Sequence, residues 1–250
     1  MSSSDDDIIY GLHAVQAALE TNPDTVDSLW VDEQRKDKRL DAIFSAARNT
    51  RLHVQAVPRA KLDRICNGGR HQGVAARMLP VRLRRESELF ELIDRAETTP
   101  LLLVLDGIQD PHNLGACIRS AAAAGVQAVI VPEDKSAPLT AVARRAAAGA
   151  AETVPIFRVK NLARVLKQLQ EHNLWVVGAA GEEAQSLYDI DLAGPVVIVM
   201  GAEGAGLRRL TREHCDYLAA IPMPGIMESL NVSVATGIFL FEAVRQRRVR

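Results

Sequence analysis

Short apolar runs alternate with amphipathic segments along most of this 250-residue chain. The segments "LLLVLD" (101–106) and "VVIVM" (196–200) are almost uninterrupted apolar runs, which is typical of strands that are buried on both faces of a parallel sheet. The segments between such runs have the length and periodicity of helices. This alternation predicts an α/β protein whose sheet is mostly parallel.

The first unit covers residues 8–80. Its start, "IIYGLHAVQAALE", predicts a strand or turn that leads into a helix with Val15, Ala18 and Leu19 on one face. Further strands are predicted at 26–32, 52–57 and 73–80, and helices at 39–50 and 58–66. We interpret this unit as a small α/β module. Residues 1–7 are expected to form a disordered tail, and residues 81–99 a linker that carries a surface helix.

The second unit covers residues 100–250 and begins with the strand at 101–106. Its final helix is expected from about residue 230 to 247, with Val234, Ile238, Phe241 and Val244 on one face. The other predicted strands are 127–132, 153–159, 174–180, 196–200 and 217–222, and the other helices are 113–124, 139–149, 161–172 and 210–215.

Composition narrows the class of protein. Aromatic residues make up only 4% of the chain, which argues against a platform on which bases stack. The three cysteines are far apart and odd in number, which argues against disulfides or a zinc site and favours a reducing compartment. The acidic start does not resemble a secretory signal, and no apolar stretch is long enough to span a bilayer. We expect a cytoplasmic protein without a membrane partner.

Charge is unevenly distributed in a chain whose net charge is only −1. Ten Lys and Arg residues fall between Arg48 and Arg85, against a single acid, Asp63. Such a cluster is typical of a surface that contacts nucleic-acid phosphates, and Arg64, Arg70 and Arg77 are candidates for that contact. A solvated face that is neutralised by the acids of residues 86–97 explains the same pattern.

Three loops follow predicted strands of the second unit, where ligands of parallel sheets collect. In the first loop, "DGIQDPHNLGACIRSAAAAG" (106–125), the unusual members are Asn113 and Arg119, because a charge among alanines needs a partner or a site. A helix cap at Asn113 and a solvent-directed Arg119 are the structural alternative.

The second loop belongs to "VVIVMGAEGAGL" (196–207), with glycines at 201, 204 and 206. The GxxGxG spacing, the late strand and the isoleucine at position 221 disagree with a dinucleotide-binding loop, and no Gly-Lys-Ser/Thr follows as in a Walker A loop. Glu203 would repel a phosphate, so a neutral or cationic ligand is favoured. A plain glycine turn with an exposed Glu203 is the alternative.

The third loop, "IPMPGIMESLNVSVATGI" (221–238), contains Ser229 and Asn231 two positions apart. Residues at this spacing do not share a helix face, so we expect both in the loop or the first helical turn. There their side chains and nearby N–H groups can contact a ligand, or simply cap the helix.

Together these loops resemble the three motifs of the SpoU-type branch of the SPOUT methyltransferases, over residues 101–247. The first unit, with "YGLHAV" and "HQGVAAR", resembles the ribosomal-protein-L30e-like domain that binds substrate RNA in some members. The resemblance is greatest to members that methylate a guanosine in the P loop of bacterial 23S rRNA. It implies a deep trefoil knot and a homodimer. It also implies that S-adenosylmethionine is the methyl donor, that S-adenosylhomocysteine is the product, and that no metal is needed.

The family pattern also implies the roles of individual residues. The expected catalytic residues are Asn113, Arg119, Glu203, Ser229 and Asn231. The expected cofactor-binding residues are Gly201, Ile221, Leu230, Met200, Ala202, Gly206 and Met223. The same chemistry on tRNA and a non-catalytic RNA-binding assembly factor remain alternatives. A nicotinamide-dependent oxidoreductase is disfavoured by the glycine spacing, and no DNA partner is expected.

Overall fold

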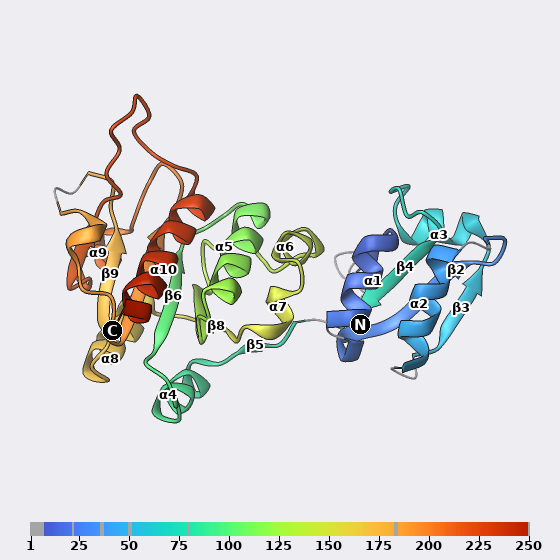
Figure 1. Cartoon of the computed structure of the whole chain (residues 1–250), viewed down its shortest axis with the longest axis horizontal. Helices are drawn as coiled ribbons and strands as arrows, with labels where there is room; N and C mark the ends of the chain where they lie inside the picture. The colour runs from blue at the N-terminus through green and yellow to red at the C-terminus, as the bar shows by residue number, and fades with distance from the viewer. Residues whose placement is uncertain are drawn as a thin grey trace.

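The computed structural model describes residues 8–249 except 22, 36–37, 50–51, 80 and 183–184, so the expected tail at 1–7 lies outside the described residues. Figure 1 shows two lobes, each built around its own sheet, with β5 near the junction between them. The N-terminal lobe contains residues 8–79 and the C-terminal lobe contains the rest.

The N-terminal lobe has a four-stranded sheet in the order β1-β4-β2-β3. The central strand β4 is antiparallel to β1 and β2, and β3 is parallel to β2. One face packs against α1 and α2 around Val15, Leu29 and Ile43, and the other against α3 around Trp30 and Leu62. Its elements are β1 (Ile8–Tyr10), α1 (Leu12–Thr21), η2 (Pro23–Thr25), β2 (Val26–Asp32), α2 (Lys38–Asn49), β3 (Val54–Val57), α3 (Arg59–Ile65) and β4 (Val74–Met78).

The C-terminal lobe has a seven-stranded sheet in the order β11-β9-β10-β6-β7-β8-β5. Every strand pairing in this sheet is parallel, in agreement with the expected parallel α/β class. Its strands are β5 (Leu83–Arg84), β6 (Leu101–Asp106), β7 (Ala128–Pro132), β8 (Ile156–Val159), β9 (Trp175–Ala179), β10 (Val196–Gly201) and β11 (Tyr217–Ala219). Because the strands are parallel, their carboxyl ends meet along one edge of the sheet.

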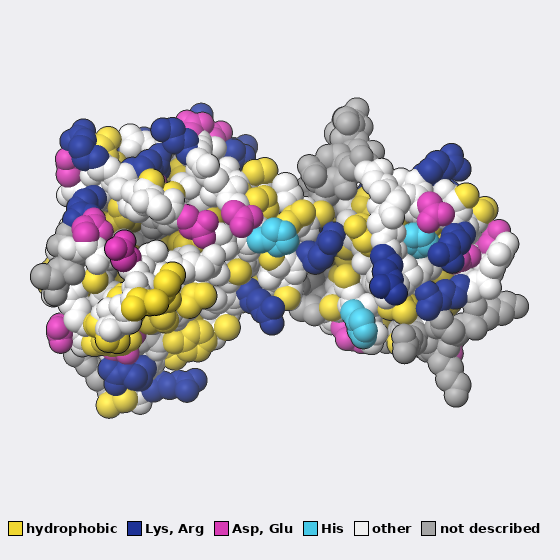
Figure 2. All heavy atoms as spheres, turned by 90° about the horizontal axis from the view of Figure 1, so that it is seen from above, with side chains coloured by type: hydrophobic (Ala, Val, Ile, Leu, Met, Phe, Trp, Pro, Cys, Tyr) yellow, Lys and Arg dark blue, Asp and Glu magenta, His cyan; other side chains and the backbone are white. Residues whose placement is uncertain are grey.

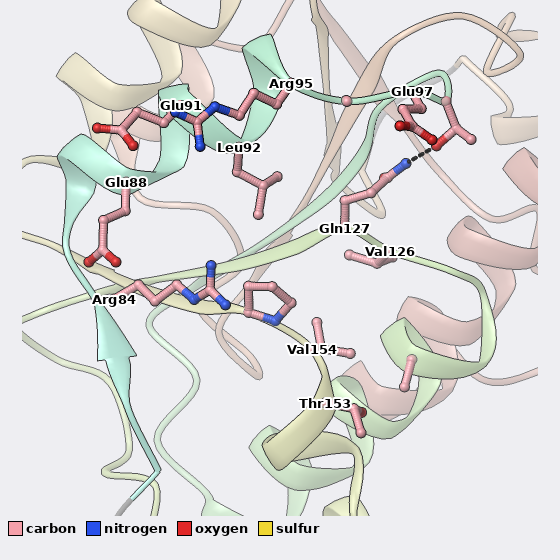
Figure 3. A pocket seen from close by; sticks show the side chains of 14 residues that line it. Arg84, Glu88, Glu91, Leu92, Arg95, Glu97, Val126, Gln127, Thr153 and Val154 are labelled. Carbon is pink, nitrogen blue, oxygen red and sulfur yellow. Dashed lines mark hydrogen bonds between the residues drawn. The ribbon is translucent and has the colours of Figure 1, made fainter.

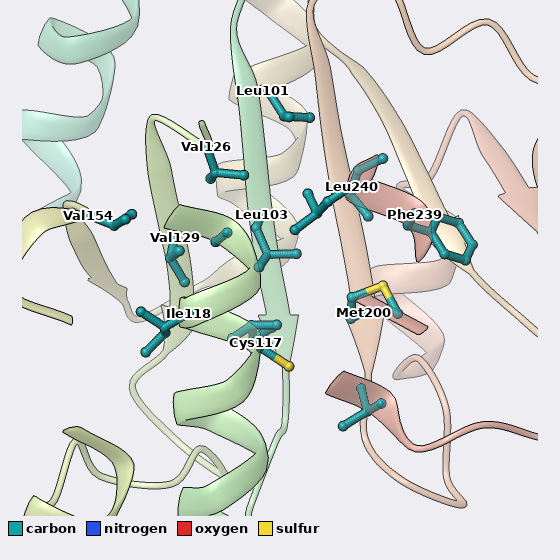
Figure 4. Close-up of a cluster of buried hydrophobic side chains, with 14 of the residues drawn as sticks. Leu101, Leu103, Cys117, Ile118, Val126, Val129, Val154, Met200, Phe239 and Leu240 are labelled. Atoms are coloured by element: carbon teal, nitrogen blue, oxygen red, sulfur yellow. The ribbon is translucent and has the colours of Figure 1, made fainter. Parts of the chain in front are cut away.

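Helices cover both faces of this sheet. Leu103 of β6 points to the face covered by α5, α6, α7 and α10, whereas its neighbours Leu102 and Val104 point to the face covered by α4 and α8. Figure 4 shows the first of these cores, between β6, α5 and α10. The helices are α4 (Glu86–Asp94), α5 (Pro111–Ala123), α6 (Ala141–Ala147), α7 (Ala150–Thr153), α8 (Leu162–Glu171), η3 (Leu187–Asp189), α9 (Arg209–Glu213) and α10 (Val232–Val249).

The interpretation of residues 81–99 as a linker with a surface helix is corrected by the structure. Strand β5 within this segment pairs with β8 and forms the edge of the large sheet. Helix α4 buries Leu89 and Ile93 in the core on the α8 side of that sheet. The mostly polar composition of the segment concealed its few core positions, and a two-residue strand gives almost no periodicity.

Two predicted helices also differ in detail. The helix expected at 139–149 is the shorter α6, which ends at Ala147 because Ala148 and Gly149 adopt left-handed conformations with φ of 50° and 89°, and the unpredicted short helix α7 follows. On α10 the expected apolar face is only half buried: Val234 and Phe241 are exposed, whereas Phe239 and Leu240 of the same helix enter the core. The end of α10 is attached through Arg247, which donates to the carbonyl groups of Thr99, Pro100, Leu192 and Gly194.

Candidate active site at the carboxyl edge of the sheet

Three polar side chains from the three predicted loops meet where β6, β10 and β11 end. Asn113 Nδ2 donates to Glu203 Oε1 at 2.6 Å. Asn231 Nδ2 donates to the same Glu203 oxygen at 3.1 Å and to Asn113 Oδ1 at 3.0 Å. These residues are 28 to 118 positions apart in the sequence, so the group exists only because the sheet order brings the three loops together.

Asn113 is free to join this group because another residue caps its helix. The N-cap of α5 is Asp110, whose side chain accepts from His112 N at 2.9 Å, and Pro111 occupies the first helical position. The alternative reading of Asn113 as the helix cap is therefore wrong. Its side chain is buried and directed toward Glu203.

Asn231 combines a structural and a site contact. Its Oδ1 accepts from Ser233 N at 2.9 Å and from Ser233 Oγ at 2.6 Å, which satisfies donors at the start of α10. This contact fixes the amide so that Nδ2 faces Asn113 and Glu203. Ser233 is thus a supporting residue that was absent from the candidate set, although its spacing from Asn231 was visible in the sequence.

The glycine loop carrying Glu203 is a tight hairpin. Ala202 and Gly206 exchange backbone hydrogen bonds of 3.0 and 2.9 Å. A Cβ at Gly201 would lie 2.2 Å from the carbonyl carbon of Gly206, and Gly204 and Gly206 adopt φ of 73° and 64°. Each of the three glycines is therefore required by the hairpin's own backbone.

A buried ion pair anchors this hairpin to the sheet. Asp106, the last residue of β6, is completely buried and accepts from Arg208 N at 3.1 Å. The Arg208 guanidinium donates to the same carboxylate through Nε and Nη2. Neither residue was among the candidates; the available signal was a carboxylate at the end of an otherwise apolar strand.

The remaining catalytic candidates lie outside the hydrogen-bonded group. Arg119 is exposed on α5, and its side chain has no hydrogen bond or ion pair with any described residue. It is six residues beyond Asn113, which corresponds to about 9 Å along the helix axis. Ser229 is exposed on the loop before α10.

The cofactor-binding candidates differ in where they lie relative to the hydrogen-bonded group of Asn113, Glu203 and Asn231. Ala202 and Gly206 lie in the hairpin, and Met223 and Leu230 lie on the loop between β11 and α10. Ile221, on the same loop, packs partly against the core. The Met200 side chain is 2% exposed and lies within the core, so only its backbone can face a ligand.

The thiols are poor candidates for nucleophiles. Burial raises the pKa of Cys117 to about 11 and that of Cys215 to about 12. Cys117 lies between α5 and α10, where its Sγ is 3.3 Å from Thr236 Oγ1. Within the described part of the chain no group of three potential metal ligands occurs, and no helix is long and apolar enough to cross a membrane.

The RNA-contact candidates of the N-terminal lobe lie on three different elements. Arg64 is on α3, Arg70 is on the loop before β4, and Arg77 is on β4, where it stacks 5.3 Å from the centre of the Trp30 ring. The cluster of Lys and Arg residues between Arg48 and Arg85 is also partly neutralised, because Arg82 pairs with Glu88 at 2.7 Å.

Comparison with known proteins identifies both lobes. Residues 8–83 match the family model for RNA 2′-O ribose methyltransferase substrate binding, and residues 100–241 match the SpoU rRNA Methylase family. The protein named 23S rRNA (guanosine-2′-O-)-methyltransferase RlmB in Pseudomonas putida is 55% identical over 242 residues, or 97% of each chain. RlmB of Escherichia coli is 54% identical over 241 residues, covering 96% of this chain and 99% of its own.

Solved structures share the whole fold. The SpoU methyltransferase AviRb from Streptomyces viridochromogenes, crystallised with the cofactor AdoMet, aligns with a TM-score of 0.77 and 26% identity over 96% of this chain and 90% of its own. A crystal structure of an RNA 2′-O ribose methyltransferase aligns with a TM-score of 0.75 and 28% identity, over 96% of this chain and 88% of its own. With the three motif loops assembled at one edge and both lobes matched, the chain belongs to the SpoU rRNA methylase family.

Proposed function

We propose that this protein transfers a methyl group from S-adenosylmethionine to the ribose 2′-oxygen of a guanosine in the P loop of 23S rRNA, and releases S-adenosylhomocysteine and, to water, the proton of the 2′-hydroxyl. The observation that carries the proposal is the hydrogen-bonded group of Asn113, Glu203 and Asn231 at the carboxyl edge of the sheet. Relatives that align over nearly the whole chain are named for this activity on this RNA.

The loops around this group fit S-adenosylmethionine, which supplies an electrophilic methyl group on a cationic sulfonium. No atom lies within 4 Å of a Cβ built at Gly204 or Gly206, so open space adjoins the hairpin. On the loop before α10, Ile226 and Met227 are 99% and 65% exposed, which leaves apolar surface available to a purine or an aliphatic chain. The holding residues would be Met200 (by its backbone), Gly201, Ala202, Gly206, Ile221, Met223 and Leu230.

The Glu203 carboxylate is held so that one of its oxygens can accept a hydrogen bond from a ligand. Both amides donate to its Oε1, and Oε2 has no partner among the described residues. A carboxylate held in this way favours a nearby cation or a hydroxyl donor. We propose that Glu203 faces the donor's positive charge, while Asn113 and Asn231 fix its orientation and Ser229 aligns the ribose.

Arg119 is assigned an electrostatic role. A guanidinium presents five N–H donors and does not readily lose a proton at neutral pH, so it is a poor general base. Its exposed position, without a side-chain partner in the described part of the chain, leaves it available to an RNA phosphate and to the alkoxide that develops on the 2′-oxygen. This assignment predicts that Arg119 affects turnover far more than cofactor affinity.

We propose that the functional unit is a homodimer formed through α10. Val234 and Phe241, one heptad apart and therefore on the same side of the helix, are 51% and 48% exposed. Exposed apolar side chains at helical spacing favour a protein partner, and a second copy agrees with the family resemblance.

In sedimentation experiments the wild-type chain should have the mass of a dimer, and Phe241→Asp should shift it to the monomer. An Arg248→Asp variant is the control, and an unchanged dimer in Phe241→Asp would refute this interface.

The domain division at residues 8–80 and 100–250 and the trefoil knot are part of the same proposal. Supporting the division, each lobe has its own sheet and the two family matches leave residues 84–99 between them. We propose a cytoplasmic location, which an rRNA substrate and three cysteines that are all free thiols support.

The deciding experiment is transfer of labelled methyl from S-adenosylmethionine to unmodified 23S rRNA, followed by alkaline hydrolysis. Label in an alkali-resistant dinucleotide would establish 2′-O-methylation and locate the guanosine; label in a mononucleotide would overturn the mechanism. Label in tRNA alone would favour the tRNA alternative, and no label in either RNA would favour an assembly factor.

The Arg119→Ala variant tests the residue assignment within that assay. It should lose transfer by about 100-fold or more while calorimetry shows nearly wild-type donor affinity, because one transition-state donor is removed. Lys167→Ala, an exposed change on α8, is the control. Wild-type turnover in Arg119→Ala would remove Arg119 from the mechanism.

A further inference from the structure

A concavity of about 440 Å³ opens on the N-terminal lobe, away from the proposed active site. It lies between the end of β2, the start of α3 and the loop of residues 68–73. Three arginines line it: Arg35, Arg59 and Arg70. The loop carries the "HQG" motif that the proposed methyl-transfer chemistry does not use.

The loop is held in one conformation by a buried histidine. His71 is 3% exposed, and its Nδ1 accepts from Gly73 N at 3.0 Å. The other ring nitrogen, Nε2, must then carry the hydrogen, which it donates to Asp63 Oδ1 at 2.9 Å. Gln72 closes the loop by accepting from Leu12 N at 3.2 Å, which joins the "HQG" and "YGLH" motifs.

Gly73 is required at the end of this loop. Its φ is 76°, and a Cβ there would lie 2.7 Å from Cδ of Arg35. The backbone thus lets Arg35 pass close enough to donate to the carbonyl oxygen of Gln72. One of the three arginines is therefore fixed in place before any ligand binds.

The charges that line the concavity favour an anion. Arg59 and Arg70 are exposed and have no hydrogen bond or ion pair with the described residues. Both acids are already engaged: Asp63 accepts from His71, and Asp32, only 6% exposed, accepts from Gln34 N at 3.1 Å. Both carboxylates keep their charge, and the Asp63 side chain is 53% exposed, but three arginines against two acids leave an excess of one positive charge in the concavity.

The loop packs against Tyr10 of its own lobe, and Tyr10 in turn contacts α6 of the C-terminal lobe. A Cβ at Gly69 would lie 2.5 Å from the Tyr10 ring, and the Arg145 guanidinium of α6 lies 5.2 Å from the centre of that ring. In Figure 1, α3 and the following loop lie on the same upper side of the molecule as the loops that carry Glu203 and Asn231. Figure 2, viewed from that side, shows Lys and Arg side chains gathered on the N-terminal lobe. The concavity and the active-site loops thus face the same side of the molecule.

A larger cavity is less suitable for an anion. It measures about 700 Å³ and is bounded by α4 and by the segments before β7 and β8, at the amino edge of the large sheet. Figure 3 shows Glu88, Glu91 and Glu97 around it. Its Arg84 stacks 6.0 Å from the centre of the Phe157 ring. The acids offset its cations, and it lies at the opposite edge from the active site.

We propose that Arg35, Arg59 and Arg70 bind backbone phosphates of the substrate RNA, so that the "HQG" loop holds the strand whose target nucleotide enters the active site. The inference rests on the proposed function for the identity of that RNA. The sequence had indicated Arg64, Arg70 and Arg77 as candidates for contact with phosphates. The inference keeps Arg70 and names Arg35 and Arg59 in place of Arg64 and Arg77.

The test compares two variants of the full chain that lose the same charge. Arg59→Ala/Arg70→Ala removes two exposed cations of the concavity, and Arg48→Ala/Lys61→Ala removes two exposed cations of the same lobe outside it. The affinity for a 23S rRNA fragment is measured over a series of salt concentrations. Each lost single-strand phosphate contact should lower the logarithmic salt slope by about 0.7, hence by about 1.4 for the concavity variant.

The control variant should keep most of the wild-type slope, and Arg59→Lys/Arg70→Lys should restore it because the charge remains. The concavity variant should raise KM for the RNA about tenfold and leave donor affinity unchanged. An unchanged slope, or an equal loss in the control, would overturn the inference. If the wild type methylates 23S rRNA and the slope is unchanged, only this inference fails; if the slope falls but no rRNA is methylated, only the proposed function fails.

Discussion

Replacement of Arg208 by alanine tests how the hairpin that carries Glu203 is held. The Arg208 side chain donates twice to Asp106, which is completely buried at the end of β6. In Arg208→Ala the carboxylate would keep only the backbone N–H of residue 208 as a partner. The variant therefore leaves an almost uncompensated charge in the core directly beneath the loop that presents Glu203.

The size of the effect follows from the burial of the pair. Loss of one partner of a buried ion pair costs about 3–5 kcal/mol. The Arg208 side chain is itself 39% exposed, so water partly screens the pair and we expect the lower end, about 3 kcal/mol. Because domains have a stability of about 5–15 kcal/mol, the variant should still fold. Its hairpin should be displaced, and donor affinity should fall at least tenfold.

Urea unfolding measures the stability and calorimetry measures donor binding. Arg209→Ala is the matched control, because the Arg209 side chain is 77% exposed and pairs with Glu213 at the surface; the change should cost less than about 1 kcal/mol. Adding Asp106→Asn to Arg208→Ala should recover part of the loss, since a neutral amide is less costly to bury. Equal stability of Arg208→Ala and Arg209→Ala, with unchanged donor binding, would refute the reasoning.

Three further changes test other parts of the fold. Gly201→Ala should abolish donor binding in calorimetry, because the new Cβ would lie 2.2 Å from backbone, whereas Gly181→Ala, with no atom within 4 Å, should bind normally. Arg247→Ala should destabilise the protein by about 3 kcal/mol in urea, since four carbonyl groups lose a charged donor, and Arg248→Ala by less than about 0.5 kcal/mol. Because burial raises the pKa of Cys215 from 9.0 to about 12, the unfolded chain releases this proton first, and stability should fall as pH rises from 9.0 toward about 12. Thermal unfolding across that range should show a smaller loss in Cys215→Ala; an equal loss would exclude the thiol as its source.

The features available from the sequence were those with local or repeated signals. The strand at 101–106 was evident because all of its residues are buried, and its alternate side chains serve two different cores. The loops that carry Asn113, Glu203 and Asn231 could be selected because each follows a predicted strand, and parallel strands place such loops at one edge; the catalytic roles of these residues came from the family resemblance. Their mutual hydrogen bonds confirm that the three loops come together.

The missing features depend on pairs that are distant in sequence or on very short elements. Asp106 and Arg208 are 102 positions apart, and neither has a local pattern that reveals the other. Strand β5 has only two residues, so its pairing with β8 could not be read from periodicity. The exposure of Phe241 likewise depends on which sides of α10 are covered by α5 and β10, which is a property of the tertiary fold.

The glycine-rich loop shows why a motif and its ligand need separate arguments. Gly201 avoids a clash with the backbone of Gly206, and Gly204 and Gly206 allow left-handed turns, so the spacing GxxGxG encodes a hairpin whether or not a ligand is present. The ligand is indicated by what the hairpin presents. Its turn carries Glu203, and two amides from distant loops bind one oxygen of that carboxylate and leave the other available. A phosphate would be repelled by this arrangement, whereas a sulfonium beside a ribose hydroxyl is complementary to it.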